Sequence, residues 1–112
     1  MNYGRSTILE IYDVKIEAPA YEDLDGIFDY IANHLKEPTV AEHICDSIEA
    51  GICSLDQIPG RYAIVSEEPF ASQGIRRMLI KNYTAFYIVD HEAKKVHVLR
   101  ILYSRRDWQS IL

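Results

Sequence analysis

The residues best suited to binding chemistry are concentrated in the last third of the chain, between Gly74 and Trp108. Arginine and tyrosine recur there within three short apolar runs, and a basic pair closes the segment. Guanidinium groups bind phosphates and carboxylates through paired hydrogen bonds. We therefore expect a polyanionic or acidic partner, and the candidate binding residues are Arg76, Arg77, Lys81, Arg100, Tyr103, Arg105, Arg106 and Trp108.

The charge of the chain supports this expectation because it is unevenly divided. The 112 residues include 12 basic and 17 acidic side chains, a net charge of −5. Residues 1–60 hold 3 basic and 12 acidic side chains (−9), whereas residues 61–112 hold 9 and 5 (+4). Such segregation is typical of a protein that presents a cationic surface to an acidic or polyanionic partner.

Size and composition indicate one soluble domain over residues 1–112, with enough apolar residues (48%) for its own core. Cys45 and Cys53 are predicted to lie on one helix about 12 Å apart, too far for a disulfide, so we expect two buried free thiols. Residues 1–11 do not resemble a signal peptide, and no run reaches the ~18 apolar residues of a membrane span. We therefore expect a cytoplasmic protein. The histidine spacing indicates no zinc site, and we expect no metal or cofactor.

The first half of the chain reads as a strand and two helices. Alternation is strongest from Tyr12 to Ile16 and predicts a strand. A proline-initiated helix is predicted from Ala18 to Leu35. Thr39 and Glu42 have the spacing of a capping box, and the second helix they open should end before Pro59-Gly60.

The second half reads as β-structure. Strands are predicted over 75–81, 84–89 and 96–102, and 62–65 is either a short strand or an extended lead-in. The tight connections predict an antiparallel meander. The fold class is therefore α+β, in the order β-α-α-β-β-β, with a mainly antiparallel sheet and a helical hairpin packed on one face.

This arrangement leaves the second face of the sheet uncovered, and we expect some of the arginines and tyrosines to share it. Strict alternation in the last strand would divide its residues into two sets. One set is Val96, Val98, Arg100 and Leu102, and the other is His97, Leu99, Ile101 and Tyr103.

The ordered motifs of the chain resemble those of a known family. They are the opening VKIEAPAYEDLDGIFDYI, the helix end SLDQIP, and the core G-x-R-R…N-Y…F-Y-x-V-D…V-x-V-L-R-I-L-Y-x-R-R-D. From about Tyr12 to Leu112 the chain resembles the RelE/ParE superfamily of toxins from bacterial type II toxin–antitoxin modules. Residues 1–11 would then be an N-terminal extension.

The resemblance implies a cytoplasmic growth inhibitor of the plasmid-stabilisation type. A cognate antitoxin would neutralise it within a hetero-oligomer. The G-I-R-R-M-L…N-Y…F-Y spacing is most similar to the ParE branch, which acts on DNA gyrase, whereas the RelE branch cleaves mRNA on the ribosome.

An RNA-cleaving toxin without a metal needs clustered cations for the phosphate and a side chain for proton transfer. If the chain were such a ribonuclease, its catalytic residues would be Arg77, Tyr103 and Arg105. However, Thr84 occupies the position where the RelE pattern has a second arginine. Tyr103 stands where histidine is common, and a tyrosine with a pKa of about 10 is a poor base at neutral pH.

We therefore favour a non-enzymatic, ParE-like inhibitor of DNA gyrase. The alternatives are a ribosome-dependent mRNA endoribonuclease and a detoxified relative that retains antitoxin binding. Several candidates also have ordinary structural explanations. Arg77 and Arg100 could pair with carboxylates on the sheet surface, Tyr83 and Tyr87 could anchor the core or a turn, and Trp108 could pack the C-terminus.

Overall fold

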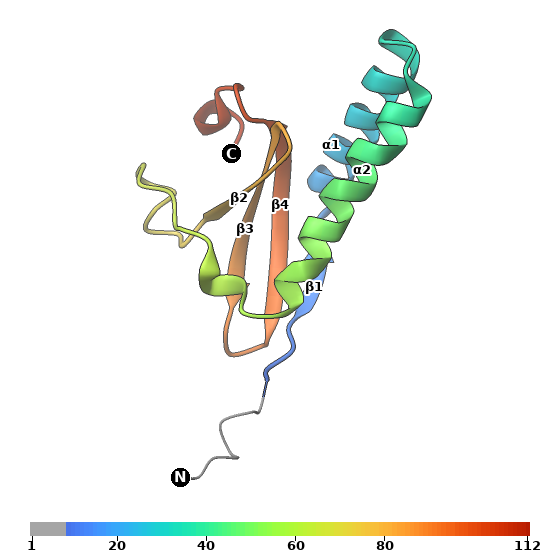
Figure 1. Cartoon of the computed structure of the whole chain (residues 1–112). Coiled ribbons are helices and arrows are strands. Elements are labelled where there is room, and N and C mark those ends of the chain that lie inside the picture. The colour runs from blue at the N-terminus through green and yellow to red at the C-terminus, as the bar shows by residue number, and fades with distance from the viewer. Residues whose placement is uncertain (1–8) are drawn as a thin grey trace.

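The computed structural model describes residues 9–112, in which a helical hairpin packs against a four-stranded sheet (Figure 1). The predicted order of elements and the predicted α+β class are confirmed. Most of the expected N-terminal extension, residues 1–8, lies outside the described residues. The elements are β1 (Asp13–Ile16), α1 (Ala18–Asp29), α2 (Pro38–Cys53), β2 (Arg76–Ile80), β3 (Tyr83–Asp90) and β4 (Lys95–Tyr103).

The sheet has the strand order β1-β4-β3-β2. Strands β2, β3 and β4 form the predicted antiparallel meander, and β1 pairs in parallel with β4. The β1 pairing is short, because it joins Asp13–Ile16 to Lys95–Val98 and leaves the last residues of β4 without a neighbour on that edge. The segment 62–65 is an extended lead-in, joined to β2 by an isolated bridge between Ile64 and Arg76.

The two helices form the predicted hairpin, and each has a proline in its first turn, Pro19 as the second residue of α1 and Pro38 as the first of α2. Helix α1 continues into a π-helical turn (Tyr30–His34) before the break. The predicted capping box was wrong, because α2 already starts at Pro38 and no side chain caps its N-terminus. Proline suits the first helical position, which places Thr39 inside the first turn. In the described part of the chain, no helix is long and apolar enough to cross a membrane.

The cysteines follow the prediction only in part. Both are free thiols, and Cys45 is buried between α2 and the sheet. Cys53 is exposed, so the expectation of two buried thiols was wrong. At this end of α2 the neighbouring Ile52 takes the buried position.

The main core lies between the helical hairpin and one face of the sheet. Fully buried apolar side chains of both layers meet there, and burial of this kind is the dominant stabilising term in folding. They include Ala20, Leu24, Ile48, Ile52, Met78, Ala85, Tyr87, Val96 and Val98.

A β-bulge in β4 changes which residues share a face. Phe86 is opposite Arg100, but the next residue, Tyr87, is opposite Val98, so Leu99 has no partner across the ladder. An extra residue of this kind reverses the alternation beyond it. Ile101 therefore joins Val98 in the main core, and strict alternation along β4 was a wrong expectation.

The second face of the sheet is covered as well, contrary to the sequence-based expectation. The chain between α2 and β2 and the C-terminal tail lie on this side, opposite the hairpin (Figure 1). Trp108 contacts Phe86 and Phe70, with ring centroids 5.1 and 5.2 Å apart. The expected packing of the C-terminus by Trp108 is thus present, and the second core includes Val65, Ile75, Phe86 and Leu102.

The junction of β1 and α1 is tied to β4 by a hydrogen bond between Glu17 and His97. The Glu17 Oε2 and His97 Nδ1 atoms are 2.7 Å apart. This hydrogen bond, more than the charge of nearby Lys15, holds the pKa of Glu17 below its usual range. A carboxyl group with a lowered pKa stabilises the fold above its unfolded pKa, and the contribution is lost as the pH falls through the folded value.

We predict that Glu17→Gln lowers the free energy of unfolding at neutral pH. The difference from the wild type should shrink as the pH falls below about 4, where the unfolded-state carboxyl becomes protonated. Urea titrations of both proteins between neutral and acid pH measure this difference, and the other carboxyl groups cancel in the comparison. A difference that stays constant across the acid range would contradict the prediction.

Candidate functional site

Arg76 is engaged in holding a turn rather than in binding from a free surface. Its Nη1 donates to the carbonyl oxygens of Gly60 (3.1 Å) and Tyr62 (2.6 Å). The Tyr87 hydroxyl donates to the carbonyl of Pro59 at 2.6 Å. Burial raises the pKa of Tyr87 to about 12, so this hydroxyl remains a donor at any physiological pH.

Arg100 is also committed inside the molecule, where it joins β4 to α1. Its Nε and Nη2 donate to the two carboxylate oxygens of Asp23, both at 2.7 Å. The same carboxylate accepts the backbone N–H of Ile101 at 2.9 Å. The hydrogen bonds to Asp23 raise the pKa of the Arg100 guanidinium. The sheet-surface role weighed for Arg100 is the one observed.

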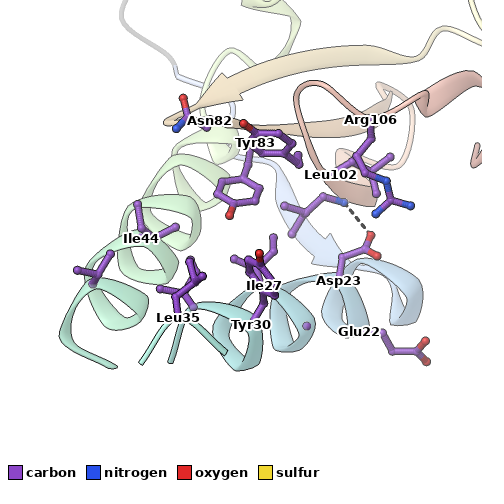
Figure 2. Close-up of a pocket in the computed structure, with 15 residues that line it drawn as sticks. Glu22, Asp23, Ile27, Tyr30, Leu35, Ile44, Asn82, Tyr83, Leu102 and Arg106 are labelled. Atoms are coloured by element: carbon purple, nitrogen blue, oxygen red, sulfur yellow. Dashed lines mark hydrogen bonds between the residues drawn. The ribbon is translucent and has the colours of Figure 1, made fainter. Parts of the chain in front are cut away.

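A groove of about 880 Å³ opens where the helical hairpin diverges from the ends of β3 and β4. Figure 2 shows Ile27, Leu35 and Ile44 on the helices and Tyr83 on the sheet around this space. Burial raises the pKa of the Tyr83 hydroxyl. The full lining is Glu22, Asp23, Gly26, Ile27, Tyr30, Ile31, Leu35, Val40, Ile44, Asn82, Tyr83, Ile101, Leu102, Tyr103 and Arg106.

Large apolar side chains on the groove walls are exposed to solvent. Tyr30 is 54% exposed, Leu35 50%, Val40 44% and Tyr103 44%. A contiguous apolar surface of this kind, bordered by charge, is typical of a protein-binding site. The charged border includes Glu22 and Asp23 on α1 and Arg106 after β4, and Figure 2 shows the three at the same end of the groove. Arg106 forms no ion pair within residues 9–112.

The residues considered for RNA cleavage are not brought together. Arg77 is paired across the sheet with Phe86, whose ring belongs to the second core. Tyr103 is paired with Tyr83, which packs against the main core on the helix side. Because cross-strand partners project from the same face, Arg77 and Tyr103 project from opposite faces of the sheet.

The surroundings of Arg77 also differ from a phosphate site. At the Thr84 position a hydroxyl contacts the Ser104 hydroxyl at 3.0 Å, where a second cation would be needed. Leu79 on the same strand is the most exposed large apolar residue in residues 9–112. Within that range, no group of three or more His, Cys, Asp or Glu side chains is arranged to hold a metal ion.

Comparison with known proteins identifies the family of the chain. A family model described as the ParE toxin of the type II toxin–antitoxin system parDE matches residues 14–108. The chain belongs to the ParE toxin family. No curated protein matches the chain.

Two solved structures have a similar fold. A chain of the chromosomal ParDE toxin–antitoxin system from P. aeruginosa is 25% identical with a TM-score of 0.68, and the match covers 84% of this toxin and 97% of that chain. A chain of the RelBE2 toxin–antitoxin complex from Mycobacterium tuberculosis is 22% identical with a TM-score of 0.56. That match covers 83% of this toxin and 91% of that chain, and it shows the fold alone.

The structure distributes the sequence-predicted residues of the toxin over several places. Tyr103 and Arg106 line the groove, and Arg105 lies exposed beside them in the chain. Lys81 is exposed in the tight β2–β3 turn, with a left-handed φ of 56°. Trp108 packs in the second core, and Arg76 and Arg100 form the internal hydrogen bonds described above.

Sequence reasoning missed the hairpin wall of the groove, which Tyr30, Leu35 and Val40 provide. A signal was present, because apolar residues continue to both sides of the break at Lys36–Pro38. A solvated connection between two helices is usually polar. Leu35 and Val40, which flank this connection, are apolar and therefore indicate a binding surface.

We predict strong coupling between Asp23 and Arg100. The side chains are only 13% and 26% exposed, so Asp23→Ala should lower the free energy of unfolding by about 2 kcal/mol, since it leaves a guanidinium and a backbone N–H without their acceptor. A double-mutant cycle with Arg100→Ala, followed by urea unfolding, measures the coupling.

The exposed pair of Glu10 and Lys94, with a nitrogen–oxygen distance of 3.2 Å, is the matched control for this cycle. Its coupling should be much weaker, because exposed ion pairs contribute little. Equal coupling in the two cycles would rule out the special role given to Asp23.

Proposed function

We propose that this ParE-family toxin arrests growth by binding DNA gyrase, without cleaving RNA, and that its antitoxin neutralises it by occupying the hairpin groove. The observation that carries the non-enzymatic part is the placement of Arg77 and Tyr103 on opposite faces of the sheet. The family match supports the gyrase target.

Metal-free RNA cleavage requires cations and a proton-transfer group within hydrogen-bonding distance of one phosphate. In this toxin Arg76 and Arg100 are already bonded internally, and Thr84 replaces a cation. Trp108 and its neighbours cover part of the face from which Arg77 projects. These features favour recognition of a folded protein over catalysis on RNA.

The groove has the chemistry of a site for a protein segment. Its walls carry exposed apolar side chains, and its border carries Arg106, which the exposed Arg105 precedes in the chain. An amphipathic segment with acidic residues would bury these apolar side chains and form ion pairs with the arginines. The chain in the P. aeruginosa ParDE structure comes from a toxin–antitoxin system, which supports an antitoxin as the occupant here.

The target is tested by assaying the purified toxin for two activities in parallel. We expect inhibition of gyrase supercoiling and no cleavage of mRNA on translating ribosomes. Codon-phased cuts that disappear in Arg77→Ala or Tyr103→Phe would make the toxin a RelE-like ribonuclease and refute the proposal. Inactivity in both assays would instead favour the detoxified relative, which binds antitoxin only.

The antitoxin site is tested by placing a charge in the groove. We predict that Leu35→Asp weakens binding of the antitoxin encoded beside the toxin gene by at least about tenfold, because a carboxylate would be desolvated against apolar walls. Phe28→Asp is the matched control, since Phe28 in α1 is likewise exposed and apolar but does not line the groove, whereas Leu35 lies after the π-helical turn and does. Calorimetric titration measures the antitoxin Kd of both variants. Equal weakening of antitoxin binding by the two substitutions would show that the antitoxin binds outside the groove.

A further inference from the structure

Each helix of the hairpin contains a glycine in its interior, Gly26 in α1 and Gly51 in α2. Glycine within a helix costs about 1 kcal/mol relative to alanine. Such a residue has a packing reason where a side chain would not fit. The two positions can therefore be compared by asking what a Cβ atom would contact.

Gly51 is explained by the packing of α2 on the sheet. A Cβ atom at this position would lie 2.8 Å from Cδ1 and 3.1 Å from Cγ1 of Ile80 in β2. Both distances are shorter than ordinary carbon contacts. The glycine thus allows the close approach of α2 to the edge strand of the sheet.

Gly26 has no such explanation within the described chain. A Cβ atom there would have nothing within 4 Å, and the residue is exposed. Its backbone is part of the helical hydrogen-bond ladder, with the Gly26 carbonyl accepting from the N–H of Tyr30. The fold described by residues 9–112 would accept alanine at this position, so a reason for glycine would have to come from a binding partner.

The position of Gly26 indicates where that reason lies. Gly26 lines the groove between the acidic Glu22 and Asp23 on one side and the apolar Ile27 and Tyr30 on the other. The missing side chain leaves a patch of bare α1 backbone in the wall of the groove. Absence of a side chain allows another molecule to approach a helix closely.

We infer that the antitoxin segment places a large apolar side chain against α1 at Gly26, which makes this glycine a determinant of antitoxin specificity. The inference rests on the proposed docking of the antitoxin in the groove. The contact is apolar because Ile27, Tyr30 and Ile101 line the groove with Gly26, and Arg106 in the same lining supplies the counter-charge for a carboxylate of the segment.

The substitution Gly26→Ala distinguishes an effect on folding from an effect on binding, because it should stabilise the free toxin and weaken antitoxin binding. In the full-length toxin it should raise the Tm by a few degrees, since alanine favours the helix and contacts nothing. It should weaken binding of the antitoxin encoded by the adjacent reading frame by about tenfold, because a methyl group overpacks the interface. Gly26→Leu should weaken binding further.

Gly51→Ala is the matched control, a second helical glycine outside the groove lining. Its antitoxin Kd should stay within about twofold of wild type whatever its effect on Tm, since distant sites act independently. Calorimetric titration gives the Kd values, and thermal unfolding of the free toxins gives the Tm values.

The outcomes distinguish this inference from the proposal on which it rests. If Leu35→Asp weakens binding but Gly26→Ala does not, the groove is the antitoxin site and the role of Gly26 is refuted. If neither variant changes the Kd, the docking proposal fails and the inference fails with it. A lower Tm for Gly26→Ala would show that the fold itself requires the glycine, which also overturns the inference.

Discussion

The carboxylate of Asp23 joins the two layers of the toxin. Strand β1 covers the edge of β4 only as far as Val98, and beyond that point the edge is completed by a side chain of α1. One carboxylate accepts the Ile101 N–H and both donors of Arg100. This contact fixes the point at which α1 leaves the sheet, and the groove exists because the hairpin diverges from β4 beyond it. The same three hydrogen bonds therefore contribute both to holding the layers together and to the shape of the binding surface.

The elements of this fold were predictable because their signals are local. Hydrophobic periodicity located both helices and the three-stranded meander, and tight turns required antiparallel pairing. The faces of β4 were not predictable, since the bulge at Leu99 is a property of the ladder with β3 rather than of the β4 sequence. The cover over the second face was missed for a related reason. The tail after Tyr103 is short and mostly polar, and Trp108 packs only because Phe70 and Phe86 are brought to it.

The residue types of the candidate site were predictable from the sequence. Which of these side chains are free to bind a ligand was not. Arginines in the last third of the chain are visible in the sequence, yet their partners are distant in it. Arg76 bonds to a carbonyl 16 residues away, and Arg100 bonds to a carboxylate 77 residues away. Each guanidinium uses two of its five N–H donors in these bonds, and the bonds hold it in place inside the fold. Tyr103 is the last paired residue of β4 and Arg106 follows shortly after it, so both lie where the chain turns away from the sheet, beside the groove.

The acidic exterior of the hairpin has a consequence for how partners arrive. Exposed carboxylates of α1 and α2, among them Asp25, Asp29, Asp46 and Glu49, face solvent, whereas Arg105 and Arg106 follow β4. This charge distribution orients an approaching charged molecule before contact, within a Debye length of about 8 Å at physiological ionic strength. An acidic partner would be turned away from the hairpin exterior and toward the arginines. Encounters would thus begin in a narrow range of orientations, at a rate that falls as salt is added.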